Sequence, residues 1–115
     1  MRTIKADLVD GFDWHGERVT ALDIQAPNGR QHALFGEPRI LVYNPDGAGY
    51  YVDQPAVIRQ YTEALVKHEG GADILPLLTL ADSMIVRGAI IDFFTAAAAA
   101  VALKRQTSSS SAPAS

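Results

Sequence analysis

The sequence predicts an α+β fold, with antiparallel β-hairpins in the first half of the chain and helices in the second. Up to residue 53, short alternating or β-branched stretches are separated by turn signals rich in Gly, Pro, Asn and Asp. From residue 54, apolar residues recur at helical spacing, and the last such stretch is the longest helical signal. We therefore expect one domain over residues 1–105, β-rich over residues 1–53 and helical over residues 54–105.

About four strands are expected, in two hairpins. Residues 2–9 and 18–25 alternate apolar and polar side chains, and the turn-rich residues 10–17 join them. Residues 39–43 are β-branched and aromatic, and the chain returns over residues 50–52 after the turn sequence N-P-D-G.

The link between the two hairpins is less determined. Asn28-Gly29 is a strong type I′ turn signal. Residues 31–35 fit a short strand or one helical turn, and the pattern does not decide between them.

Three helical segments follow the hairpins. Asp53 or Gln54 caps the first, which ends at Gly70-Gly71, and a cap at Asp73 opens a short second one. The long third helix spans residues 79–105. Thr79 and Asp82 predict a capping box there, in which the carboxylate reaches back to the N–H of Thr79. Residues 106–115 carry no charge and no large apolar side chain, so we expect a disordered tail.

The long helix is apolar on two sides. At about 100° per residue, one broad face contains Ile85, Val86, Ala89, Ile90 and Phe93, and we expect this face in the core. The opposite stripe combines Met, Arg and aromatic residues, which are enriched in protein interfaces. The predicted partner-binding residues are Met84, Arg87, Ile91, Asp92, Phe94 and Ala98. A helix that is central in a bundle explains the same pattern.

Composition argues against several classes of function. The net charge is −3 and no basic stripe is present, so nucleic acid is not an expected partner. The chain has no Cys, which excludes disulfides and thiolate metal sites. The N-terminus lacks the apolar core of a signal peptide. Arg87 and Asp92 within the long helix argue against a membrane span, since each costs about 2.5–3.5 kcal/mol near the centre of a bilayer.

No pattern for catalysis or cofactor binding is found, and we expect a protein that is not an enzyme. His15, His32 and His68 are far apart in the sequence, and neither a nucleophile elbow nor a phosphate-binding loop occurs. Asp10, Asp13, His15 and Glu17 could ligate a divalent metal, but without EF-hand spacing. A small metal-binding domain built on residues 10–17 therefore stays as an alternative, although a solvated turn is favoured.

Two stretches resemble a known family. Residues 16–27, G-E-R-V-T-A-L-D-I-Q-A-P, and residues 75–94, L-P-L-L-T-L-A-D-S-M-I-V-R-G-A-I-I-D-F-F, are similar to segments of the tail assembly chaperones of long-tailed bacteriophages, including the Mu-like group. The resemblance covers about half of the chain. It departs from the family pattern at Gln25, where Arg is usual, and in the longer insert over residues 29–53.

The resemblance implies a role in virion morphogenesis. Such chaperones keep the long apolar tape-measure protein soluble until the tail tube polymerises around it, and they are absent from the mature virion. It implies the cytoplasm of an infected bacterial host, the tape-measure protein as partner, and contact with the tail tube protein. Self-association into a homo-oligomer is left open. The alternative of the same class is a structural or connector protein that remains in the particle.

Overall fold

The computed structural model describes residues 2–110, with side chains as far as Thr107. The elements in chain order are β1 (Thr3–Trp14), β2 (Glu17–Gln25), α1 (Gly29–Phe35), β3 (Arg39–Tyr43), β4 (Gly49–Asp53), α2 (Pro55–Leu65), β5 (Val66–Lys67), the 3₁₀ helix η1 (Gly71–Leu77) and α3 (Leu80–Ser110). The predicted α+β fold is confirmed, including its antiparallel hairpins and its long final helix.

The strands form two separate antiparallel sheets. β1, β2 and β5 form the larger one, in that order, and β3 pairs only with β4. One face of the larger sheet packs on α2, η1 and the first half of α3. The buried apolar residues of this core are Ala6, Phe12, Leu22, Ile24, Tyr61, Leu65, Val66, Ile74, Val86, Ile90 and Phe93.

Three predicted local features were wrong. Asn28 caps α1 instead of forming a hairpin turn, because its side chain and that of Gln31 form a capping box. α2 ends at Leu65 and not at Gly70-Gly71, because the next two residues pair with β2 as β5. The 3₁₀ helix is preceded by Gly70 as its N-cap, without a side-chain cap from Asp73.

The ends of two other elements also differ from expectation. β1 runs through most of the predicted loop, so the turn of the first hairpin is confined to His15 and Gly16. α3 continues to Ser110, so residues 106–110 of the predicted tail are helical. The remainder of that tail, residues 111–115, lies outside the described residues.

A carboxylate joins the sheet to the long helix. β1 bulges between Asp7 and Phe12, where four residues of β1 face the single residue Thr20 of β2, so their N–H groups leave the ladder. The Asp82 carboxylate accepts three of these, from Val9 (2.6 Å), Asp10 (3.1 Å) and Gly11 (2.8 Å). Gly11 suits the bulge, because its φ is +77° and a Cβ there would lie 2.5 Å from the carbonyl oxygen of Val19 on β2.

The predicted capping box is therefore only half formed. The N–H of Asp82 does donate to the Thr79 hydroxyl at 3.2 Å, as a cap requires. The Thr79 hydroxyl in turn donates to the Asp10 carboxylate at 2.7 Å, and the Asp82 carboxylate turns to the bulge. Burial by itself raises the pKa of a carboxyl, but at Asp82 the three N–H donors outweigh it, and the pKa lies below its ordinary value.

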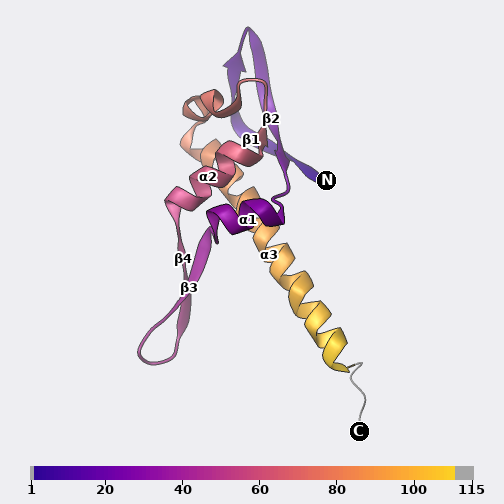
Figure 1. Ribbon diagram of the computed structural model, residues 1–115. Helices are drawn as coiled ribbons and strands as arrows, with labels where there is room; N and C mark the ends of the chain where they lie inside the picture. Colours follow the sequence, from indigo (N-terminus) through magenta and orange to yellow (C-terminus); the bar gives the residue numbers. More distant parts are fainter. Residues whose placement is uncertain (1, 111–115) are drawn as a thin grey trace.

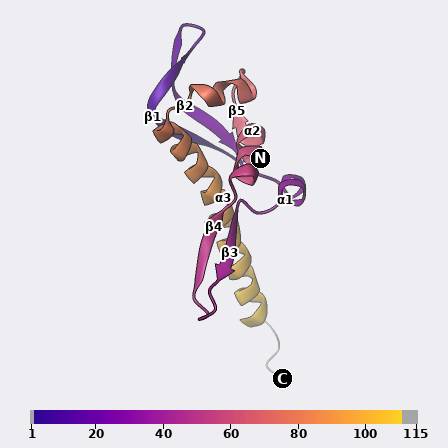
Figure 2. The same cartoon turned by 90° about the vertical axis from the view of Figure 1, so that its left-hand side faces the viewer.

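The molecule is elongated. Its Cα radius of gyration is 17.6 Å, against about 13 Å for a compact domain of this length. Figure 1 shows the cause: the β1–β2 hairpin lies at one end, while the β3–β4 hairpin and the second half of α3 leave the body at the other. Figure 2, turned by 90°, shows the same two elements extending in the same direction.

Replacing Asp82 with Asn should lower the thermal unfolding temperature by several degrees at pH 7, because the bulge loses its charged acceptor. The acid dependence should change as well. A depressed folded-state pKa gives stability that is complete above the pKa of an unfolded Asp, about 3.9, and is lost as the pH falls toward the folded value. Thermal melts at pH 7 and below pH 4 should show this loss in the parent chain and less of it in Asp82→Asn.

Asp92→Asn is the matched control, since Asp92 is an exposed carboxylate on the same helix. Equal melting temperatures for the two variants would contradict a structural role for Asp82.

Candidate partner-binding surfaces

The second half of α3 touches little of its own domain. Every side chain over residues 95–107 is exposed, and we call this segment the free arm. It contains five consecutive alanines, followed by Val101 and Leu103, which are 49% and 65% exposed. Alanine maintains the helix by propensity alone and presents a smooth wall that another helix can approach closely.

The β3–β4 hairpin, which we call the ribbon, is apolar on both faces. Cross-strand pairs place Leu41 opposite Tyr51 on one face, and Ile40 opposite Val52 on the other. All four of these side chains are exposed, as are Tyr43 and Tyr50. A two-stranded ribbon alone is marginally stable in water, and strands apolar on both faces are usually covered on both. The ribbon therefore has the composition of an interface.

The root of the ribbon is fixed to the body. The Tyr61 hydroxyl of α2 donates to the carbonyl of Gly36 at 2.6 Å, and the side-chain amide of Gln54 donates to the carbonyl of Glu37 at 2.6 Å. Arg39 and Asp53 form an ion pair across the first rung at 2.8 Å. Burial, with a smaller effect of the Glu37 charge, raises the pKa of Tyr61, so its hydroxyl keeps the proton that it donates.

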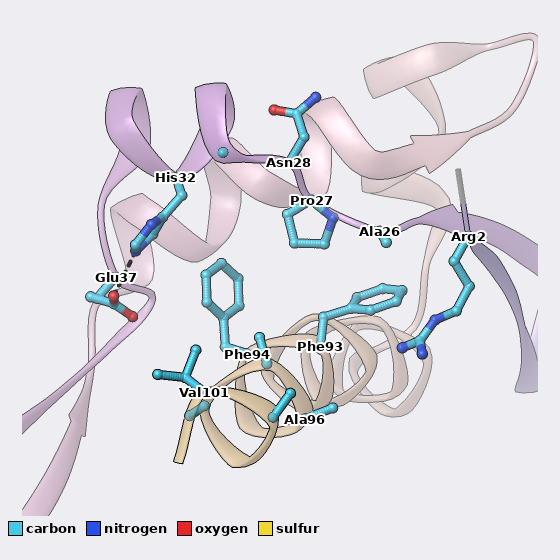
Figure 3. Close-up of a pocket in the computed structure, with 14 residues that line it drawn as sticks. Arg2, Ala26, Pro27, Asn28, His32, Glu37, Phe93, Phe94, Ala96 and Val101 are labelled. Carbon is cyan, nitrogen blue, oxygen red and sulfur yellow. Dashed lines mark hydrogen bonds and ion pairs between the residues drawn. The ribbon is translucent and has the colours of Figure 1, made fainter. Parts of the chain in front are cut away.

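A groove of about 670 Å³ opens where the free arm leaves the body (Figure 3). One wall is the α3 stripe of Phe93, Phe94, Ala97 and Val101. The other wall is the segment from the end of β2 to the start of β3, with Pro27 and Asn28 above the rings and the His32–Glu37 pair, 2.6 Å apart, at one side.

Aromatic contacts form the inner end of this groove. The Phe94 ring packs edge-on against Tyr61, with ring centroids 5.0 Å apart, and lies 6.0 Å from the ring of His32. The Arg2 guanidinium lies 5.4 Å from the centroid of Phe93. The domain core therefore ends at these rings, and the same helix face continues outward over the alanines without cover.

The structure divides the predicted partner stripe into three parts. Phe93 is buried and Phe94 half-buried, as expected, and Phe94 with Ala98 lines the groove. Met84 and Arg87 are exposed nearer the start of α3, and Asp92 is exposed between the two regions. Ile91 is only 9% exposed and is not a surface residue. Because α3 packs against both β1 and α2, its buried arc is wider than the single face that periodicity predicted.

Comparison with known proteins gave no match. No protein-family model, curated protein or solved structure matches this chain significantly. The surfaces described here therefore have to be interpreted from their own chemistry.

By length and composition, α3 could cross a membrane over Leu80–Thr107. Its first half supplies Val86, Ile90 and Phe93 to the domain core. About 17% of the 18-residue apolar stretch that could span a membrane is buried. Arg87 and Asp92 are exposed within the same stretch. A span would have to remove the core residues from the sheet and desolvate both charges.

The acidic residues proposed as metal ligands point to other partners. Asp13 pairs with Arg18 at 3.2 Å, and Asp10 accepts the Thr79 hydroxyl. Within residues 2–110, no three His, Asp or Glu side chains lie close enough together to hold a metal ion. Asp10 points to the start of α3 and Asp13 to Arg18, so these carboxylates do not converge.

Sequence reasoning missed the ribbon as a surface. Its strands were predicted, but no partner surface was assigned to them. The available signal was that both faces of residues 39–43 and 50–52 are apolar, which is typical of strands that are covered on both sides.

The burial of Ile91 gives a direct test. Ile91→Ala should lower the free energy of unfolding by about 2–3 kcal/mol, the cost of an apolar cavity. Met84→Ala is the matched control, because Met84 is 54% exposed on the same helix and should change stability by less than about 0.5 kcal/mol. Urea denaturation of both variants checks this. A loss of stability at Met84 equal to that at Ile91 would contradict the burial pattern.

Proposed function

We propose that this protein is an assembly chaperone that binds an apolar helical segment of a client, and that the client is the tape-measure protein of a long-tailed phage. The observation that carries the proposal is that two apolar elements, the ribbon and the free arm, project in the same direction. A groove lies between the free arm and the segment that leads from β2 to the ribbon. The identity of the client rests on the family resemblance of residues 16–27 and 75–94.

The two projecting elements are matched in length. Strands of five residues extend about 17 Å, and the helix over residues 95–107 extends about 20 Å. A client helix lying along the alanines would continue the stripe that ends at Phe93 and Phe94 inside the domain. It would also cover one face of the ribbon. Apolar surface of both the client and the ribbon would thereby be removed from water.

The composition of this surface suits a transient carrier. The alanine wall has no deep pocket or charged anchor, so it favours apolar helices in general over one sequence. The ribbon adds tyrosines, which make large contacts at a low cost in side-chain entropy. A chaperone that must bind many turns of a long client and then release them requires this broad selectivity.

Under this proposal the protein acts in the cytoplasm of the infected host and leaves before the virion matures. The chaperone would contact the tail tube protein when the tube polymerises around the tape-measure protein and the chaperone is released. The competing function of the same class, a connector that stays in the particle, is favoured by the same exposed ribbon. Mass spectrometry of purified particles separates the two functions, because a connector is present in them and a chaperone is not.

Co-expression with the tape-measure protein of the same genome should raise the soluble yield of that protein. Ala97→Glu should abolish most of this gain, because Ala97 lines the groove and a carboxylate there must be desolvated by an apolar client. Leu41→Glu on the ribbon should also reduce it. Soluble and pelleted tape-measure protein, quantified after lysis, provides the measurement.

Ala99→Glu is the matched control: it makes the same change on the same exposed helix, at a position that does not line the groove. It should leave the client's solubility near that given by the parent chain. The proposal fails if Ala97→Glu and Ala99→Glu behave alike while both variants remain folded by circular dichroism.

A further inference from the structure

A second, smaller cleft lies where α2, η1 and α3 meet. Its volume is about 300 Å³, at the lower end of the range for ligand pockets. It is separate from the groove, with which it shares no lining residue. The cleft is lined by Pro55, Ile58, Arg59, Thr62, Leu75, Leu78, Ser83, Val86 and Arg87.

The floor of this cleft is apolar and its surroundings remain apolar. Ile58 and Val86 are 6% and 1% exposed at the bottom. On α3, one turn apart, Leu80 and Met84 are 79% and 54% exposed on the same side of the helix as Arg87. A partner side chain entering the cleft would therefore be flanked by further apolar surface.

The rim carries two cations from different helices. Arg59 of α2 and Arg87 of α3 are both exposed, and neither takes part in the ion pairs found within residues 2–110. Glu63 stands one turn after Arg59 on α2, at a spacing that often gives an ion pair, yet its carboxylate is not within 4.0 Å of that guanidinium. The N–H donors of both guanidinium groups are therefore accessible to carboxylates of another molecule.

We propose that this cleft binds an acidic amphipathic segment of a partner protein. One large apolar side chain would fill the cleft, and carboxylates before and after it would pair with Arg59 and Arg87. Charge complementarity selects this occupant over an uncharged apolar helix. Two isolated arginines on a chain of net charge −3 do not provide the several phosphate contacts that nucleic acid requires.

The inference is independent of the proposed function. It assigns Met84 and Arg87, the part of the predicted stripe that the groove does not use, to a second partner of different chemistry. A protein with both sites could hold an apolar client at one end of α3 while an acidic segment of another protein docks near the other end.

The test uses the full chain and a defined probe. The probe is a capped synthetic peptide of about 14 residues, with Leu at every third or fourth position and Glu at the others. Because an isolated helix of this length and charge is marginal in water, a side-chain crosslink holds the peptide helical. We expect it to bind in a fluorescence anisotropy titration, more weakly as salt is raised. The same helix with Lys in place of Glu should not bind measurably.

Charge reversal locates the site. Arg59→Glu with Arg87→Glu should weaken binding of the Glu helix by about tenfold or more. Lys104→Glu with Arg105→Glu is the matched control, since it reverses two exposed cations near the other end of α3 and should change the affinity by less than about twofold. Arg59→Gln with Arg87→Gln, which removes charge without adding any, should give a smaller loss in the same direction.

Several results would overturn the proposal. One is equal binding of the Lys and Glu helices, which would indicate apolar association alone; absence of binding by the Glu helix is another. Equal losses from the two charge reversals would indicate a general effect of net charge. If the protein self-associates by sedimentation and Arg59→Glu with Arg87→Glu makes it monomeric, the occupant is a second copy of this chain. The Arg variants leave the groove unchanged, so they should still raise the soluble yield of the tape-measure protein. This measurement tests the groove separately from the cleft.

Discussion

The contact between the Asp82 carboxylate and the β1 bulge is the constraint on which the arrangement of the molecule depends. A carboxylate that is 0% exposed is tolerable only when donors replace its water, and here three backbone N–H groups do so. The bulge in turn needs an acceptor, because its N–H groups have left the β-ladder. Each requirement satisfies the other, so the start of α3 has one defined position against the sheet.

The exposed elements follow from that position. With its first turns fixed at the bulge, α3 crosses the core as far as Phe93 and Phe94 and then continues past the edge of the domain. The ribbon is held independently, through the Tyr61 hydroxyl and the carbonyl of Gly36 at its root. Two rigid attachments therefore leave apolar surface on one side of a small body, uncovered by any other part of residues 2–110. This is the physical basis for assigning that side to a partner.

Much of this architecture could be predicted from local patterns. Periodicity located β1 and β2, residue composition and the turn sequence N-P-D-G located β3 and β4, and Pro55 marked the start of α2. β5 was not predicted. The misplaced features depend on contacts between distant residues. Asp82 has the spacing of a capping box with Thr79, but its actual partners lie 71 to 73 residues away, on a bulge that no strand pattern announces. Ile91 lies outside the face of α3 that periodicity places in the core, yet it is only 9% exposed. A helical wheel of α3 alone contains none of the other elements of the fold. α1 supplies Gly29 and His32 to the proposed groove, and this helix was not predicted because Asn28-Gly29 indicated a hairpin turn.

The central claim is that the ribbon and the free arm form the client-binding side of the molecule. Amide hydrogen exchange of the full chain, with and without the co-purified tape-measure protein, tests it most directly. Backbone amides over residues 95–107 and in β3 and β4 should exchange readily in the free protein and become protected in the complex, while those of β1 and β2 stay unchanged. Protection confined to β1 and β2, with the free arm and ribbon exchanging as before, would contradict the claim.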